Sequence, residues 1–145
     1  MIKQFQKLSN EERELLFNAP VLISVLASCS LNDINVSQRS GYIKMAHLKT
    51  FTAILILGPY YEEVEKDFNE RFEAATKKYF PFDQNRRIAL KKEIVSVNFL
   101  IERMNTEYAY DLQKSLEEYT RHIRKAAYSI FRDFIFPVPL TGLTV

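Results

Sequence analysis

The sequence predicts an all-α fold: one helical bundle of about six helices that forms a single domain over residues 1–145. Apolar residues recur at steps of three and four over most of the chain, which is the spacing of one helix face. Three glycines and five prolines are too few for a turn-rich sandwich or barrel of strands. An apolar fraction of 47% over 145 residues suffices for a full core, and no repeat or linker divides the chain.

The first 50 residues predict three helices. Ser9 is followed three residues later by Glu12, the spacing of a capping box, so the first helix begins at residue 10. Pro20 lacks a backbone N–H, which predicts a break near Asn18 and suits the first turn of a second helix. A third helix is expected around residues 42–49, followed by a short connector over residues 50–58.

Residues 59–80 predict one long helix that begins at Pro59 and is ended by Pro81. Its apolar side chains step by three or four and form one stripe: Tyr61, Val64, Phe68, Phe72, Ala75 and Tyr79.

Two further helices with the same spacing follow. Asp83 is placed to cap the first of them, and a brief turn at Asn105 separates the two. Their stripes are Leu90, Ile94, Val97, Ile101 and Met104, and then Leu112, Leu116, Tyr119, Ile123, Ala126 and Ile130. Matched stripes joined by a short turn predict an antiparallel helical hairpin. The tail FIFPVPLTGLTV, residues 134–145, holds two prolines and no charge, so we expect it to be extended along a groove between helices.

Three stretches carry a family resemblance: LSNEERELLFNAPVLISVLASCS at 8–30, SCSLNDINVSQRSGYIK at 28–44, and HLKTFTAILILGPYYEEVEKDF at 47–68. Together they resemble the TerB-like family, helical domains named after tellurite-resistance proteins and also found in a membrane-anchored DnaJ-type co-chaperone. The resemblance implies a helical domain of a bacterial stress-response or membrane-associated assembly, which is an analogy from fold.

Many members of that family carry an acidic loop, Asp-Gly-x-Ile-x-x-x-Glu, whose oxygens suit a hard cation. The matching positions here are Leu31, Asn32, Ile34 and Gln38, so only the isoleucine agrees; Asp33 falls on a variable position. One carboxylate is too few for Ca²⁺, which takes six to eight oxygen ligands. We therefore expect a turn that has lost its metal, and a metal-dependent switch at residues 31–38 is the last of three hypotheses.

A basic pole is a candidate binding surface. In an antiparallel hairpin, residues near 86–92 lie beside residues near 118–126, and the end of the preceding helix arrives at the same place. The cations expected there are Lys77, Lys78, Arg86, Arg87, Lys91, Lys92, Arg121, Arg124 and Lys125. Arg86 and Arg87 sit at a helix N-terminus, where the dipole opposes positive charge. This conflict indicates an anionic partner such as lipid headgroups, nucleic acid or an acidic protein; a merely solvated basic surface is the alternative.

The other candidates favour structural interpretations. His47 and His122 are far apart, and neither has a partner at metal-ligand spacing. Cys29 suits packing as a small apolar group. The carboxylates of residues 62–73 suit a solvated helix face. Among the tyrosines, Tyr61 and Tyr119 fall on core stripes, whereas Tyr60, Tyr108 and Tyr110 are expected to be exposed.

Composition and motifs favour a protein that is not an enzyme. No phosphate loop, HExxH or GxSxG motif is present, so we expect no catalytic site and no cofactor. The net charge is +2, the single cysteine suits a reducing cytoplasm, and the apolar runs are too short to span a membrane. The leading prediction is a non-enzymatic interaction module with a protein partner in the cytoplasm. An anion-binding module that uses the basic pole is the second, and the oligomeric state stays open.

Overall fold

The computed structural model describes residues 2–27 and 54–123, and these residues form helices and no strand. The predicted all-α class is therefore confirmed. The six α-helices of the described residues are α1 (Asn10–Phe17), α2 (Ala19–Ala27), α4 (Gly58–Lys66), α5 (Phe68–Tyr79), α6 (Gln84–Glu102) and α7 (Thr106–Ile123). Two 3₁₀ turns, η1 (Lys3–Phe5) and η2 (Leu55–Leu57), precede α1 and α4. The predicted helix at 42–49, the 31–38 loop and the tail lie outside the described residues.

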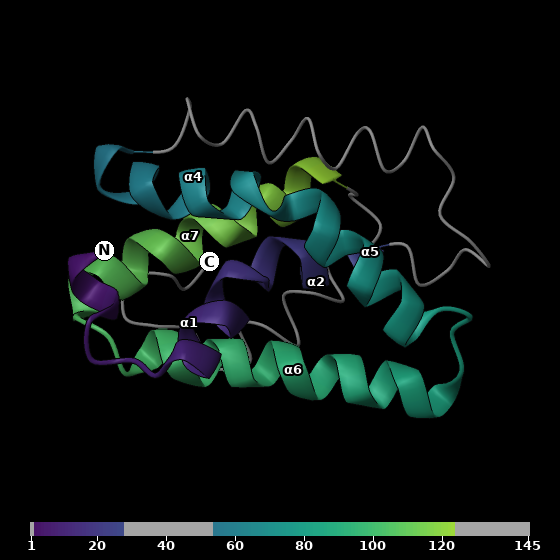
Figure 1. Ribbon diagram of the computed structural model, residues 1–145. Helices are drawn as coiled ribbons and strands as arrows, with labels where there is room; N and C mark the ends of the chain where they lie inside the picture. Colours follow the sequence, from purple (N-terminus) through teal and green to yellow (C-terminus); the bar gives the residue numbers. More distant parts are fainter. Residues whose placement is uncertain (1, 28–53, 124–145) are drawn as a thin grey trace.

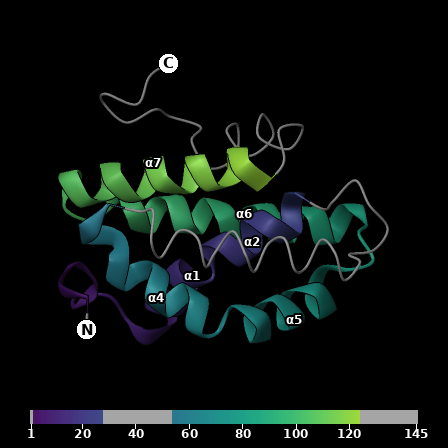
Figure 2. The ribbon, with the colours of Figure 1, turned by 90° about the horizontal axis from the view of Figure 1, so that it is seen from above.

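Helix α2 forms the centre of the bundle. All nine of its residues are buried, and it packs against α5, α6 and α7 (Figures 1 and 2). Its sequence APVLISVLA has no charged residue. This composition suits a helix that has no face exposed to solvent.

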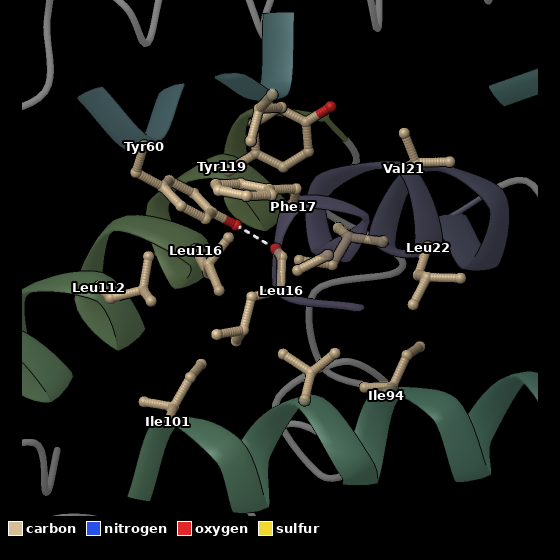
Figure 3. Close-up of a cluster of buried hydrophobic side chains, with 14 of the residues drawn as sticks. Leu16, Phe17, Val21, Leu22, Tyr60, Ile94, Ile101, Leu112, Leu116 and Tyr119 are labelled. Carbon is tan, nitrogen blue, oxygen red and sulfur yellow. Dashed lines mark hydrogen bonds between the residues drawn. The ribbon is translucent and has the colours of Figure 1, made fainter. Parts of the chain in front are cut away.

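The break between α1 and α2 lies at Asn18, as Pro20 predicts. The capping box at the start of α1 is also present: the Ser9 hydroxyl accepts from the Glu12 amide at 3.1 Å, and the Glu12 carboxylate accepts from the Ser9 amide at 2.9 Å. Because Pro20 has no N–H, it cannot bond the carbonyl of Leu16 four residues earlier. The Tyr60 hydroxyl donates to that carbonyl instead, at 2.7 Å (Figure 3).

The predicted long helix is divided at Asp67, whose backbone (φ −116°, ψ 17°) leaves the helical region. Before the break, α4 packs against α1; after it, α5 packs against α2 and α6. The bend therefore lets α4 and α5 pack against different helices. The six residues of the predicted stripe are all buried, so the stripe was right although the single helix was wrong.

The α6–α7 hairpin is present but opens away from its turn. Near the turn, the Gln113 side-chain amide donates to Asn98 at 2.8 Å. Farther along, α2 enters between the two helices, where Ile23 lines one small cavity together with Ile94 and Leu116. Figure 3 shows the resulting cluster of side chains from the N-terminal helices, α4, α6 and α7. The end of α7 consequently lies apart from the first turn of α6 (Figure 1), contrary to the expected juxtaposition.

Two of the three tyrosines expected at the surface lie in the core. Tyr60 is 0% exposed and Tyr108 is 3% exposed, whereas Tyr110 is half-buried. Phe5 of η1 packs edge-on against the rings of Tyr60 and Tyr108, with ring centroids 6.1 and 6.0 Å apart. Burial raises the pKa of the Tyr60, Tyr61 and Tyr108 hydroxyls above their usual range.

Tyr61 and Tyr119 are fully buried, as predicted. The Tyr61 hydroxyl shares a hydrogen bond with Ser115 at 2.6 Å, and the Tyr119 hydroxyl shares one with Ser24 at 2.8 Å. The core thus contains hydroxyl pairs that join α4 and α2 to α7.

Candidate functional site

The structure brings together part of the expected basic pole. Lys77 and Lys78 end α5, and a short connection over residues 80–83 leads to α6. The first nine residues of α6 include Arg86, Arg87, Lys91 and Lys92. Arg121 lies near the end of α7, and that end of the helix is apart from the junction in Figure 1. Arg124 and Lys125 lie outside the described residues.

Acidic groups accompany several of these cations. The Lys78 ammonium lies 3.1 Å from the Glu93 carboxylate, and Arg121 lies 3.6 Å from Glu117. Asp83 caps α6 as predicted, since its carboxylate accepts from the Arg86 amide at 2.7 Å. That carboxylate offers the helix N-terminus the negative charge it favours, which relieves the dipole conflict inferred from the arginines.

The Arg86 guanidinium donates to the Pro81 carbonyl at 3.0 Å, so it also ties down the connection before α6. Lys77, Arg87 and Lys92 are exposed, and the described part of the chain offers them no acidic partner. The side chains of Lys78 and Arg86 are also 59% and 41% exposed, but each has an acidic group within 4 Å.

An apolar stripe on the solvent side of α6 was missed by the sequence analysis. Ile88 is 44% exposed and Phe99 is 59% exposed, with the partly buried Val95 between them. Steps of seven and four place these residues on one stripe, opposite the buried stripe of the same helix. Arg87, Lys91 and Lys92 flank or interrupt it, and we call these six residues the outer face of α6.

The outer face begins at a hollow of about 440 Å³ beside the α5–α6 connection. Phe82, Arg87, Ile88 and Lys91 are among its lining residues. Apolar and cationic side chains therefore share one depression in the surface.

A second groove lies between the N-terminal helices, α5 and α6, with a volume of about 460 Å³. We call it the Arg71 groove; it is lined by Glu11, Glu14, Leu15, Asn18, Leu22, Arg71, Ala74, Ala75, Lys78, Tyr79 and Glu93. The sequence analysis did not identify it. The available signal was Arg71, a cation directly before Phe72 of the buried stripe.

Arg71 lies where the two helix breaks meet. Its guanidinium is 2.8 Å from Glu14 of α1 and 3.9 Å from Asp67 at the α4–α5 break, and it covers the Phe17 ring at 5.7 Å. The side chain is 14% exposed. Its Nη1 atom and the Oδ1 atom of Asn18 are both buried, and neither has a hydrogen-bond partner among the described residues.

The other end of the Arg71 groove holds a compact polar group. The Tyr79 hydroxyl donates a short hydrogen bond to Glu93, which also pairs with Lys78. Burial, and then the neighbouring carboxylate, raise the pKa of Tyr79. The hydrogen bond to Glu93 therefore ties the end of α5 to α6.

Neither a metal site nor a membrane helix is found in residues 2–27 and 54–123. No three His, Cys, Asp or Glu side chains of these residues are grouped to hold a metal, and no helix of theirs is both long and apolar enough to cross a bilayer. The loop with Asp33, Cys29 and His47 lies outside the described residues. His122 lies in the last turn of α7.

Comparisons of the chain with protein-family models, with curated proteins and with solved structures gave no match.

Proposed function

We propose that this protein is a non-enzymatic interaction module that binds an acidic, amphipathic segment of a partner protein on the outer face of α6. The observation that carries the proposal is the exposure of Phe99 and Ile88 on one stripe, which has cations beside its first half, around Ile88. The proposal combines the interaction module expected from the sequence with its anion-binding alternative.

The apolar part of the outer face has the composition of an interface centre. Exposed aromatic and aliphatic side chains in line are what an amphipathic helix uses to dock on a partner. From Ile88 to Phe99 the stripe spans eleven residue steps, or about 16 Å of helix. That length matches about three turns of a partner helix.

The charges at the rim select the partner. Arg87 and Lys92 have no acidic partner in the described residues, so a complementary segment supplies carboxylates opposite them. Such rim charges raise the association rate and orient the partner more than they raise the affinity, and salt weakens their effect.

The resemblance to TerB-like domains supports the same class of function, in a bacterial stress-response or membrane-associated assembly of the cytoplasm. Lipid headgroups or nucleic acid bound at the basic residues remain the second candidate. A metal-dependent switch at residues 31–38 remains the third.

Capture from an extract of the native cell tests the proposal. The immobilised full chain should retain a protein that Phe99→Ser and Arg87→Glu/Lys92→Glu both lose. Two matched controls, Leu55→Ser and Lys7→Glu, alter an exposed apolar residue and an exposed cation elsewhere and should retain it. Calorimetry with the purified partner should then show weaker binding at higher salt.

Equal retention by all five proteins would remove the outer face from the proposal. Loss of retention after nuclease treatment, or binding of the chain alone to phosphatidylserine vesicles that disappears in Arg87→Glu/Lys92→Glu, would instead support the anion-binding candidate. Heat from a calcium or zinc titration that fits about one site would favour the metal-dependent switch.

A further inference from the structure

We infer that a hollow between the N-terminal turn and the α6–α7 connection is a second binding site, separate from the outer face of α6, and that it takes a phosphate monoester. We call it the Lys3 hollow. Its volume is about 660 Å³, within the usual range for small-molecule sites. It is lined by Lys3, Gln4, Gln6, Lys7, Leu8, Arg103, Met104 and Asn105. Leu8 is buried and Met104 partly buried, so the lining also offers apolar surface to the organic part of an ester.

The lining selects an anion. Three of its eight residues are cations, three carry side-chain amides, and none of the eight is acidic. Lys3 and Lys7 are exposed and the Arg103 side chain is 61% exposed, so all three are open to a ligand. No carboxylate of residues 2–27 or 54–123 pairs with either lysine. Lysine and arginine side chains together are the usual groups that bind phosphate oxygens.

The charges around the hollow favour a compact ligand with two negative charges. Glu12 already pairs with Arg103 at 2.8 Å, so the three cations keep a net charge of about +2. A phosphate monoester carries close to two negative charges above its second pKa of about 6. Glu107 and Asp111 line an adjoining hollow that shares two residues with this one, so a longer polyanion would meet these carboxylates. A single phosphate group fits this arrangement better than nucleic acid does.

Both walls of the hollow are held in place by the rest of the bundle. Phe5, between the two lysines in sequence, is 0% exposed, and the Arg13 guanidinium donates to the carbonyls of Phe5 and Gln6 at 3.0 and 3.1 Å. On the other wall, the Asn105 side chain caps α7 by accepting from the Glu107 amide at 3.0 Å. The ligand therefore does not have to order the backbone that carries the cations, which lowers the cost of binding.

The experiment is an NMR titration of the isotope-labelled full chain with phenyl phosphate at low salt and about pH 7.5, where the ester is a dianion. We expect saturable chemical-shift changes in the backbone amides of residues 3–8 and 103–105, with a Kd of about 1 mM. Lys3→Gln/Lys7→Gln should weaken binding about tenfold or more, because it removes both unpaired cations. The matched control Lys66→Gln/Lys114→Gln removes two exposed lysines elsewhere and should bind as the wild type does.

Glu12→Gln should tighten binding about threefold, because it removes the carboxylate that competes for Arg103. This gain of affinity keeps the test valid if the lysine variant does not fold, and an unchanged affinity would contradict the inference. Absence of saturable shifts at roughly 10 mM probe would also overturn it. Equal weakening by Lys66→Gln/Lys114→Gln would show that net charge alone attracts the probe.

Benzoate and an oligonucleotide test the assignment to a monoester. Benzoate has the same ring and one negative charge, so it should bind about fivefold more weakly or worse, and equal affinity would overturn the assignment. A single-stranded oligonucleotide that displaces the probe at micromolar concentration would identify a nucleic-acid surface and would also overturn it.

A phosphate monoester can belong to a free small molecule or to phosphatidic acid at a membrane surface. Sedimentation with vesicles of phosphatidylcholine and phosphatidic acid that Lys3→Gln/Lys7→Gln abolishes would identify the lipid, whereas a chain that binds phenyl phosphate and stays in solution would identify a free ester. Arg87→Glu/Lys92→Glu should bind phenyl phosphate normally, and Lys3→Gln/Lys7→Gln should still retain the partner of the outer face. The two sites therefore stand or fall separately.

Discussion

Helices α2 and α6 differ in how their apolar residues relate to the rest of the bundle. In α2 every residue is buried, because α5, α6 and α7 surround it. Helix α6 buries one stripe, which includes Leu90 and Ile101, and carries a second apolar stripe on the opposite side, which is exposed at Ile88 and Phe99. The same residue types therefore stabilise the fold in one helix and are available for binding in the other.

The contrast teaches that position in the bundle, and not apolar content alone, decides what an apolar side chain does. A central helix has a neighbour for each of its faces. An edge helix has neighbours on one side, so apolar residues on its other side add little to folding, and the proposed function assigns them to a partner.

The largest expected effect is a difference in the free energy of unfolding between two isoleucine variants, one in α2 and one in α6. Ile23→Ala in α2 should lower the free energy of unfolding by about 2 to 5 kcal/mol, because Ile23 is 2% exposed and its loss leaves a cavity beside Ile94 and Leu116. Ile88→Ala in α6 should change it by less than about 0.5 kcal/mol. Urea unfolding followed by circular dichroism measures both free energies. Similar losses of stability for the two variants would contradict the proposed difference between α2 and α6.

Matched serines should give a smaller difference. Ser24 and Ser96 each donate to the carbonyl four residues earlier, at 2.8 and 3.0 Å, but only Ser24 is buried and also bonds Tyr119. Ser24→Ala should therefore lose about 1 to 3 kcal/mol of stability, since it removes a partner from a buried hydroxyl. Ser96→Ala should be neutral or slightly stabilising, because alanine favours the helix. Thermal unfolding of the two variants tests this difference. An unchanged stability of Ser24→Ala would show that the hydrogen bond between the Ser24 and Tyr119 hydroxyls does not stabilise the core.

The smallest effect is expected at the exposed end of α6. Arg103, directly after α6, pairs with Glu12 of α1 at 2.8 Å. The backbone amide of Ser9, and then Arg103, hold the pKa of Glu12 below its usual value. A carboxyl with a lowered pKa in the folded state adds stability above its unfolded pKa and loses it as the pH falls through the folded one.

Glu12→Gln should accordingly be less stable than the wild type near neutral pH, and the difference should shrink as the pH falls from about 5 to about 3. Urea midpoints measured over this range test the prediction. Glu62→Gln, an exposed glutamate of α4, is the control and should follow the wild-type curve. A difference for Glu12→Gln that does not vary with pH would show that the charge has no part in it.

Local signals predicted the features that depend on neighbours in sequence. Pro20 predicted the break at Asn18, Ser9 and Glu12 predicted the capping box, and Asp83 predicted the cap of α6. The buried stripe of α4 and α5, that of α6 and the part of the α7 stripe formed by Leu112, Leu116 and Tyr119 followed from their spacing, because one face of a helix must meet the core. For Ile123, Ala126 and Ile130 the prediction falls outside the residues whose burial is described.

Features that depend on distant contacts were not predictable from local signals. The break at Asp67 lets α4 and α5 follow different neighbours, and the opening of the hairpin reflects the entry of α2, which no spacing within α6 or α7 reveals. The Arg71 groove likewise needs Glu14 and Asn18 to meet α5. Tyr60 was wrongly assigned to the surface. Its hydroxyl is buried because it donates to a carbonyl 44 residues away, and no local signal indicates that bond.

The Tyr60 hydroxyl bonds the carbonyl of Leu16, which Pro20 cannot bond because it has no N–H. Proline interrupts the main-chain ladder at the start of α2, and a side chain from α4 supplies the missing donor. Whether phenylalanine is tolerated at residue 60 therefore depends on what stands at residue 20: beside an alanine, which brings its own N–H, the hydroxyl would be redundant. We therefore expect the effects of substitutions at residues 20 and 60 on stability to be non-additive.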